Sequence, residues 1–407
     1  MYIFKAGVLG AGAMGAEIAQ VITYSGLPVV LKDIDQELVD GGLERIRAIY
    51  QRRVDKGKMS PTTMAEKLDL VEGTTSYDPF SDMDIVIEAV PEDIELKKRV
   101  FQELEKVCPE GTIFASNTSA LSISEMGAAT KRPEKVIGMH FFNPAHVMKL
   151  VEVIPGLETD QDTIDSLVTF AESLRKIPVV VQECPGFLVN RLLVPYLNEA
   201  TYCLQEGAAT AREIDEAIVE FGMPMGPFTL MDMLGLDVCY DVGKYLYSEY
   251  GERGKPAALF ERLYVAGRLG EKVGAGFYGY GTETDEPVKE MIAQIQEETG
   301  IRGTPFRVER CFLPLINEAA MCLQENISSP TDIDMAMMAG TGMKKGTTPM
   351  GPLAIADEMG LDEVLTQLEE FEAQFGERFR PARLLRLKVK ANHLGVKTGR
   401  GFLEHAG

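Results

Sequence analysis

The chain has 407 residues, of which 45% are hydrophobic, and a formal net charge of −21 at pH 7. This length predicts two or three domains with cores of ordinary size, and the acidic balance argues against nucleic acid or an anionic membrane as a partner. None of the six cysteines forms a C-x-x-C pair, and the N-terminus lacks the charged-then-apolar pattern of a signal segment. We therefore expect reduced thiols, a cytoplasmic location, no metal site and no membrane-spanning segment.

The first expected strand, residues 6–9, runs into a glycine-rich turn with the spacing G-x-G-x-x-G and then into a helix-forming run. Gly10 allows a sharp turn, Gly12 lets a pyrophosphate approach the backbone, and Gly15 lets the helix pack closely on the strand. The N–H groups at the start of that helix, beside Met14, would bind the phosphates. The sequence therefore predicts a dinucleotide site that includes these four residues; a tight strand–helix turn without a ligand is the alternative.

A carboxylate follows the second expected strand, residues 28–32. Asp33 lies 23 residues after Gly10, where it can accept hydrogen bonds from both ribose hydroxyls and would repel a 2′-phosphate. The sequence therefore predicts NAD rather than NADP as the cofactor, although the neighbouring Lys32 could weaken that exclusion.

Strands and helices continue to alternate as far as residue 184. Further strands are expected over residues 84–88, 112–115, 136–140 and 149–154, with a long charged helix at about 36–56 and an amphipathic helix over 92–107. This alternation predicts a Rossmann-type α/β domain over residues 1–184, with a mostly parallel sheet and helices on both faces.

The remainder of the chain is expected to be helical, and it is duplicated. Residues 190–200 match residues 309–319 at an offset of 119, and the blocks at 225–228 and 274–277 recur at 350–353 and 399–402 at an offset of 125. Blocks repeated in the same order predict two tandem all-α domains, over residues 185–282 and 303–407, joined by a linker near 281–304.

Two residues in neighbouring strands form the expected catalytic pair. His140 ends an apolar strand, where side chains of a parallel sheet face the ligand crevice, and an imidazole titrates near neutral pH. Glu152 is the single acid in the apolar run over residues 150–154, and a buried polar group costs about 2–7 kcal/mol unless it is paired. A base oriented by an acid is the expected interpretation; a structural histidine and a solvent-facing glutamate are the alternatives.

Neutral hydrogen-bonding side chains follow the strand expected at 112–115, in the run Ser116-Asn117-Thr118-Ser119. At the end of a strand they could hold a carbonyl or the cofactor amide, or they could form an ordinary capping turn. Taken with the His-Phe-Phe-Asn-Pro run over 140–144, residues 148–153 and the Pro-Gly-Phe-Leu-Val-Asn-Arg run over 185–191, this turn resembles the motifs of the 3-hydroxyacyl-CoA dehydrogenases, including the 3-hydroxybutyryl-CoA type.

This resemblance implies a role for each matching position. His140 corresponds to the family's general base, and Glu152 corresponds to the acid that orients it. Ser119 and Asn190 correspond to residues that hydrogen-bond the reacting oxygen and the thioester carbonyl, and Asn143 supports the same site. The family often has a second serine at the position after Ser119, where this chain has an alanine.

The resemblance also implies contacts to the cofactor and to coenzyme A. Glu92 and Lys97 correspond to residues near the nicotinamide ribose, and Asn117 lies at the nicotinamide end of the crevice. A basic run lies where the family contacts the nucleotide part of coenzyme A, namely Arg52, Arg53, Lys56 and Lys58. Arg52 and Lys56 are expected to bind the substrate there, and a solvated helix face is the alternative.

The activity implied by the resemblance is NAD-dependent oxidation of an L-3-hydroxyacyl-CoA to the 3-oxoacyl-CoA, in fatty-acid or butyrate metabolism, by a monofunctional enzyme. A dehydrogenase of a free hydroxy acid or sugar acid and a non-catalytic NAD-binding protein are the rival hypotheses. The second helical copy has Glu309 where the first has Asn190. We therefore expect one active site per chain and an internal pseudo-dimer of the two helical domains, with homo-oligomers left open.

Overall fold

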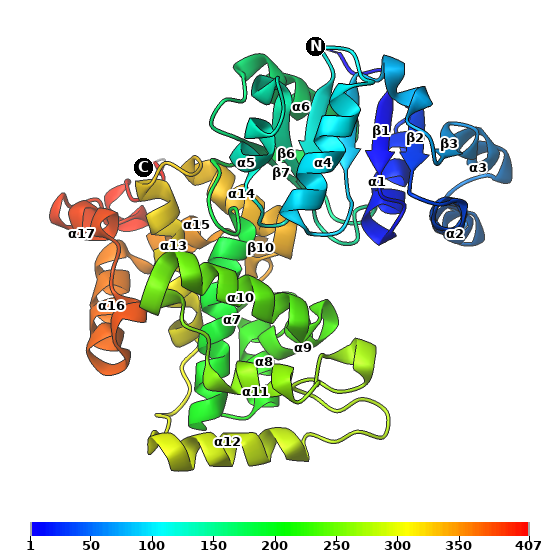
Figure 1. The fold of residues 1–407 in the computed structure, drawn as a ribbon. Helices are drawn as coiled ribbons and strands as arrows, with labels where there is room; N and C mark the ends of the chain where they lie inside the picture. The colour runs from blue at the N-terminus through cyan, green and yellow to red at the C-terminus, as the bar shows by residue number, and fades with distance from the viewer. Residues whose placement is uncertain (1, 406–407) are drawn as a thin grey trace. The chain divides into compact units, whose positions relative to one another are not determined.

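The computed structural model describes residues 2–405. They divide into two compact units, and the boundary along the chain lies between Glu183 and Cys184. The first unit contains an eight-stranded sheet with helices, and the second is almost entirely helical (Figure 1). The expected architecture, a Rossmann-type sheet domain followed by helical structure, is thereby confirmed. No helix among residues 2–405 is long and apolar enough to cross a bilayer.

The sheet of the first unit has the strand order β3-β2-β1-β4-β5-β6-β7-β8. Its strands are β1 (Ala6–Leu9), β2 (Val29–Lys32), β3 (Val71–Thr74), β4 (Ile85–Glu88), β5 (Ile113–Ser116), β6 (Val136–Phe141), β7 (Leu150–Pro155) and β8 (Ile177–Val180). Neighbouring strands from β3 to β6 are parallel, whereas β7 runs antiparallel to β6. The carboxyl ends of the parallel strands therefore share one edge of the sheet, where ligands of open α/β sheets bind.

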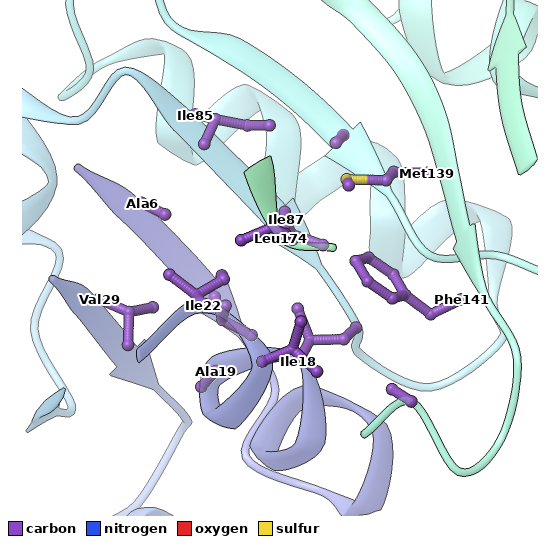
Figure 2. Packing of buried hydrophobic residues seen from close by; sticks show 14 of the residues in the cluster. Ala6, Ile18, Ala19, Ile22, Val29, Ile85, Ile87, Met139, Phe141 and Leu174 are labelled. Carbon is purple, nitrogen blue, oxygen red and sulfur yellow. The ribbon is translucent and has the colours of Figure 1, made fainter. Parts of the chain in front are cut away.

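Six α-helices belong to this unit: α1 (Ala13–Tyr24), α2 (Gln36–Asp55), α3 (Pro61–Leu68), α4 (Ile94–Glu105), α5 (Ile123–Ala128) and α6 (Gln161–Ser173). Five of them begin at an Asp or Ser whose side chain accepts an N–H from the first turn, which satisfies a backbone donor that the helix leaves unpaired. Apolar side chains of α1 and of the central strands belong to one core cluster, and Figure 2 labels Ile18 and Ile22 of α1 and Ile87 and Met139 of the strands in it. This core fixes the start of α1 against the end of β1.

The sequence did not predict the strands β3 and β8. The first reads Val-Glu-Gly-Thr and the second Ile-Pro-Val-Val, and both are only partly buried. They are the two outermost strands of the sheet, where one side needs no partner and where glycine and proline are tolerated. Their apolar patterns are therefore weaker than those of the central strands.

The second unit contains the two helical copies. The first copy comprises α7 (Val189–Glu206), α8 (Ala211–Phe221), α9 (Pro227–Leu234), α10 (Leu236–Tyr250) and α11 (Ala258–Val265). The second comprises α13 (Glu309–Gln324), α14 (Pro330–Thr341), α15 (Pro352–Met359), α16 (Leu361–Phe375) and α17 (Arg383–Lys390). The long helices α7 and α13 pack against each other (Figure 1), and each carries an internal proline at the matching position, Pro195 and Pro314.

The segment expected to be a linker is more ordered than its composition suggests. Residues 286–299 form α12 (Glu286–Thr299), which packs on α7 and α11 of the first copy. Its buried residues Val288 and Ile295 are seven positions apart, so they lie on one helical face. The density of Gly, Thr, Glu and Asp around this segment hid a short amphipathic helix.

Candidate active site

The glycine-rich turn has the geometry that a dinucleotide needs. Gly10 adopts φ of +95°, and a Cβ atom there would lie 2.4 Å from the carbonyl oxygen of Ala89. A Cβ atom on Gly15 would lie 1.7 Å from the oxygen of Gly10, whereas one on Gly12 would meet nothing within 4 Å. Gly10 and Gly15 therefore close the turn, and Gly12 leaves the space over the N-terminus of α1 open.

The start of α1 can accept an anion because no side chain among residues 2–405 caps it. Its N-cap is Gly12, no side chain caps the first N–H groups, and the first turn has no acidic residue. Met14 lies in this first turn. The exposed donors and the positive end of the helix dipole suit a pyrophosphate.

Asp33 lies directly after β2, beside the glycine-rich turn. Its Oδ2 accepts the N–H of Ala11 at 2.6 Å, and its Oδ1 accepts the N–H of Ile34 at 2.7 Å. The ammonium group of the neighbouring Lys32 lies 4.2 Å from the ring centre of Tyr77, and burial lowers the pKa of this lysine. The turn thus positions the Asp33 carboxylate, while the lysine is held against an aromatic ring.

A buried charge network lies at the ends of β4 and β5. Glu88, the last residue of β4, is fully buried and accepts from Lys97 at 2.7 Å, from Ser116 Oγ at 2.6 Å and from the N–H of Val90 at 2.7 Å. Lys97 is 1% exposed, and its ammonium also lies 3.2 Å from the carboxylate of Glu92. Lys97 therefore holds Glu92, the other residue expected near the nicotinamide ribose, and does not present its own charge to solvent.

The turn after β5 is organised by the same network. Glu92 accepts Thr118 Oγ1 at 2.6 Å and the N–H of Ser119 at 2.9 Å. Asn117 Oδ1 accepts the N–H of Phe141, at the end of β6, at 2.9 Å. These bonds fix the backbone of Ser119 and tie its turn to the strand that carries His140.

His140 and Glu152 are in contact, as the sequence predicts. They lie directly opposite each other in the antiparallel pair of β6 and β7, and directly opposed residues point to the same face of a sheet. Their side chains are buried, and Nδ1 of His140 lies 2.7 Å from Oε2 of Glu152. With Nδ1–H donating to the carboxylate, Nε2 carries the lone pair that can accept a proton.

The loop between β6 and β7 is tied to α1 and to the start of β8. Glu17 of α1 accepts the N–H of Ala145 at 2.5 Å and lies 3.3 Å from Nδ1 of His146. Lys176 donates to the carbonyl oxygen of Met148 at 2.6 Å. These contacts hold the loop that follows His140, in which Asn143 is exposed.

Asn190 lies in the first turn of α7 and belongs to the second unit, whereas His140 and Glu152 belong to the first. Its counterpart Glu309 opens α13, where its carboxylate lies 3.7 Å from the guanidinium of Arg307. The second copy therefore presents a charged residue where the first presents an amide.

A basic groove of about 490 Å³ is the other notable feature of the first unit. Its lining includes the four basic residues predicted from the sequence, at positions 52, 53, 56 and 58, together with Lys149, Arg175 and Lys176. Lys176 is half-buried, and burial lowers its pKa to about 8. In a chain of net charge −21, this concentration of cations favours an anionic ligand.

One wall of the groove is built around Tyr24 of α1. The guanidinium of Arg53 lies 4.7 Å from the ring centre and donates to the hydroxyl at 2.9 Å, and that of Arg175 lies 5.4 Å from the same ring. Arg175 adopts φ of 61°, which a residue with a side chain seldom does. Packing on Tyr24 orients both guanidinium groups at the groove.

Two features of these sites were not predicted from the sequence. They are the place of Glu88 in the buried network and that of Lys149, Arg175 and Lys176 in the basic groove. Glu88 had a readable signal, because it is the single acid in the apolar run Ile85-Val86-Ile87-Glu88, the pattern that identified Glu152. The three cations had none, because they lie roughly a hundred residues along the chain from the basic run and only the fold brings them to it.

Fold and site together define a dinucleotide-binding protein of the Rossmann class with a histidine–glutamate pair at the carboxyl edge of its sheet. The family model described as "3-hydroxyacyl-CoA dehydrogenase, NAD binding domain" matches residues 5–184. The model described as "3-hydroxyacyl-CoA dehydrogenase, C-terminal domain" matches twice, over residues 186–280 and 306–405. The chain belongs to the 3-hydroxyacyl-CoA dehydrogenase family, and its cofactor is NAD.

Known proteins of this family resemble the chain over most of its length. The fatty acid oxidation complex subunit alpha of Shewanella amazonensis is 41% identical over 396 residues, which are 94% of this chain and 55% of that protein. The chain thus spans about half the length of the curated relatives it matches. The crystal structure of 3-hydroxybutyryl-CoA dehydrogenase from Escherichia coli K12 aligns with a TM-score of 0.87 at 31% identity, covering 96% of this chain and 99% of that one. (S)-3-hydroxybutyryl-CoA dehydrogenase PaaH1 from Ralstonia eutropha is 41% identical, with a TM-score of 0.67 over 69% of this chain.

Proposed function

We propose that the protein oxidises L-3-hydroxyacyl-CoA to 3-oxoacyl-CoA with NAD, in the oxidation of fatty acids or in butyrate metabolism. The observation that carries the proposal is the 2.7 Å contact between His140 and Glu152 at the edge of the sheet where NAD binds. A base held by a buried acid suits removal of the hydroxyl proton as hydride leaves the carbon. A cytoplasmic location is part of this proposal, and the free thiols of Cys203, Cys311 and Cys322 fit a reducing compartment.

His140 acts in this scheme as the general base for the 3-hydroxyl group. Glu152 fixes the tautomer by accepting from Nδ1–H, so that Nε2 takes the proton, and the carboxylate then stabilises the imidazolium. Bound NAD supplies the hydride acceptor. In the reverse direction the imidazolium returns its proton to the 3-oxo group.

Neutral donors are assigned to the substrate oxygens. Ser119, whose backbone Glu92 holds, would hydrogen-bond the reacting oxygen. Asn190 of the second unit would bind the thioester carbonyl, with Asn143 in support. An amide donor suits an oxygen that gains negative charge, whereas the carboxylate of Glu309 would repel it. The second copy is therefore proposed to be catalytically silent.

The basic groove is assigned to the nucleotide part of coenzyme A. Its predicted contacts Arg52 and Lys56 share the groove with Arg175 and Lys149. The phosphates of coenzyme A match a dense set of cations better than a free hydroxy acid or sugar acid does. This groove is what favours a coenzyme A thioester over those rival substrates.

Substitution of the base tests the proposed reaction. His140→Gln should lower kcat about 10²–10⁴-fold with acetoacetyl-CoA and NADH, while NADH affinity, read from nucleotide fluorescence, changes little. His393→Gln, in the second copy, is the matched control and should keep wild-type rates. Retention of more than about half the wild-type activity by His140→Gln would exclude the assignment, and turnover of the free 3-oxo acid at a similar rate would favour the rival substrate class.

We also propose that the two helical copies act as an internal pseudo-dimer, so that one chain supplies both halves of an interface. Arg191 of the first copy pairs with Glu318 and Glu325 of the second, at 2.8 Å each. Arg310, at the position equivalent to Arg191, pairs with the first copy's glutamates at 199 and 206, at 2.7 and 2.8 Å.

Every residue in these pairs has a counterpart of the same type 119 positions along the chain. Arg191 corresponds to Arg310, Glu199 to Glu318 and Glu206 to Glu325. A second reciprocal set repeats the arrangement, because Arg253 contacts Glu318 at 3.1 Å and Arg378 contacts Glu199 at 2.7 Å. Reciprocal contacts between equivalent residues are the mark of a twofold, self-complementary interface. They support a second copy that is retained for packing rather than for chemistry.

A further inference from the structure

The two helical copies differ in what covers their last helix. In the first copy, α12 lies across α7 and α11 (Figure 1). Gln296 of α12 donates to the carbonyl oxygen of Gln205 at 3.1 Å, and Glu298 lies 2.5 Å from the guanidinium of Arg262. The apolar residues Val288 and Ile295 of α12 are buried. An amphipathic, acidic helix is therefore part of the first copy.

The second copy repeats the surface on which α12 lies. In the first copy, Gln205 Oε1 accepts the N–H of Leu259 at 3.1 Å, and in the second copy Gln324 Oε1 accepts the N–H of Leu384 at 3.0 Å. The framework is thus the same to within 0.1 Å at this contact. In both copies one helix packs on this pair, α10 on α7 and α11 and its counterpart α16 on α13 and α17. Among residues 2–405, however, no further helix packs on α13 and α17 as α12 packs on α7 and α11.

Residues of the second copy are more exposed at the place that α12 covers in the first copy. Leu204 and Gln205 are 5% and 8% exposed in the first copy, whereas their counterparts Leu323 and Gln324 are half-buried and exposed. An open cavity of about 560 Å³ lies there, and its apolar lining is Leu323, Leu384, Leu387 and Phe402, which we call the α17 face. Leu387 is 50% exposed.

Charge indicates what would fit the α17 face. The helix α17 carries Arg383, Arg386, Lys388 and Lys390 and no acid. The helix that occupies the equivalent place in the first copy carries four glutamates and one lysine. A cationic helix with an open apolar face is complementary to an amphipathic helix with acidic flanks.

We propose that the α17 face binds an acidic amphipathic helix of a partner protein, in the way that α12 covers the equivalent face of the first copy. The partner helix would place aliphatic residues at i, i+3 or i+4 and i+7 over Leu384 and Leu387, and its carboxylates would lie near the cations of α17. The duplication thus supplies both the surface and an example of its ligand.

The probe that tests this is a peptide of residues 285–300, blocked at both ends and labelled for fluorescence anisotropy with the full-length protein. Because an isolated helix of this length is marginal in water, binding should also raise the helical content of the peptide. Saturable binding is expected, with at least a tenfold loss of affinity in Leu387→Asp. Leu157→Asp, an equally drastic change at a residue 92% exposed in the first unit, should bind the peptide as the wild type does.

Replacing the peptide's glutamates at positions 290, 297 and 298 by glutamine should weaken binding severalfold and flatten its salt dependence. Absence of saturable binding at peptide concentrations up to about 1 mM would overturn the proposal. Equal binding to the wild type and to Leu387→Asp would also overturn it, because the peptide would then be exchanging with α12 on the first copy. A chain dimer in light scattering that Leu387→Asp dissociates would identify a second copy of this chain as the occupant, and would likewise overturn it.

Discussion

The reciprocal ion pairs between the helical copies predict an unequal response to two equivalent substitutions. Arg310→Met removes the cation that Glu199 and Glu206 share, and these side chains are 2% and 8% exposed. Glu199 keeps Arg378 at 2.7 Å, whereas Glu206 keeps it only at 3.9 Å. Arg191→Met leaves one buried glutamate, 9% exposed, and one that is 42% exposed and can be hydrated. Removal of one partner of a buried pair costs about 3–5 kcal/mol because the remaining charge stays buried.

Because Glu199 keeps Arg378 and Glu318 keeps Arg253, the difference rests on Glu206, which is buried, and Glu325, which is not. Arg310→Met should therefore destabilise the protein by up to about 3–5 kcal/mol, and Arg191→Met by about 1–3 kcal/mol less. Methionine keeps an unbranched, flexible side chain in place of the aliphatic part of the arginine, which limits the loss of packing. The chain has no tryptophan, so urea unfolding is best followed by far-UV circular dichroism, which the helical unit dominates. Arg47→Met, whose exposed pair with Glu44 should contribute little, is the matched control. An Arg191→Met protein as unstable as Arg310→Met, or both within about 0.5 kcal/mol of the control, would refute the reasoning.

Three further predictions concern the cofactor, the substrate and the pH dependence of stability. Asp33 should make kcat/KM with NAD more than about tenfold higher than with NADP, and equal values would show that another cation overrides its charge. Arg175→Ala should raise KM for an acyl-CoA about 3–10-fold and leave KM for the acyl-pantetheine thioester unchanged, with Arg47→Ala as the control; an equal rise for both thioesters would remove the groove from coenzyme A binding. Burial raises the pKa of Asp334 to about 6, so the folded state holds this proton more tightly than the unfolded state, and stability is lost as pH rises from about 4 to about 6. Asp334→Asn should therefore gain up to about 3 kcal/mol relative to the wild type between pH 4 and pH 7 in urea unfolding, and a constant difference would contradict this.

The contact between His140 and Glu152 could be predicted from the sequence because each of these residues departs from the pattern around it. A histidine at the end of an apolar strand and a single acid within the next strand are both costly to bury alone. The two strands are antiparallel neighbours, so the register that pairs their backbones also places His140 opposite Glu152. The glycine-rich turn was predictable for a related reason, since at Gly10 and Gly15 a Cβ atom would collide with backbone.

Features that depend on long-range assembly could not be predicted in the same way. The groove cations at 149, 175 and 176 join the basic run only through the packing of α1 and the loop after β6. The positive φ of Arg175 has no sequence signal, because glycine is the residue that normally marks this conformation. The helix α12 was hidden for a different reason, since its apolar stripe is short and its flanks have the composition of a linker.

The duplication allows structural requirements to be separated from functional ones within a single chain. Contacts that both copies keep, such as the clamp of Asp232 on the N–H of Phe277 and of Asp357 on that of Phe402, at 2.8 Å in each copy, are needed for the helical fold. Positions at which the copies differ are free of that requirement, so their differences record what each copy does. Asn190 against Glu309 separates a copy that can bind a carbonyl from one that cannot, because only the amide is a neutral donor. By the same logic, the reciprocal arginine–glutamate pairs belong to both copies because the interface needs both. The open α17 face belongs to one copy, because among residues 2–405 only the first copy is covered by a helix such as α12.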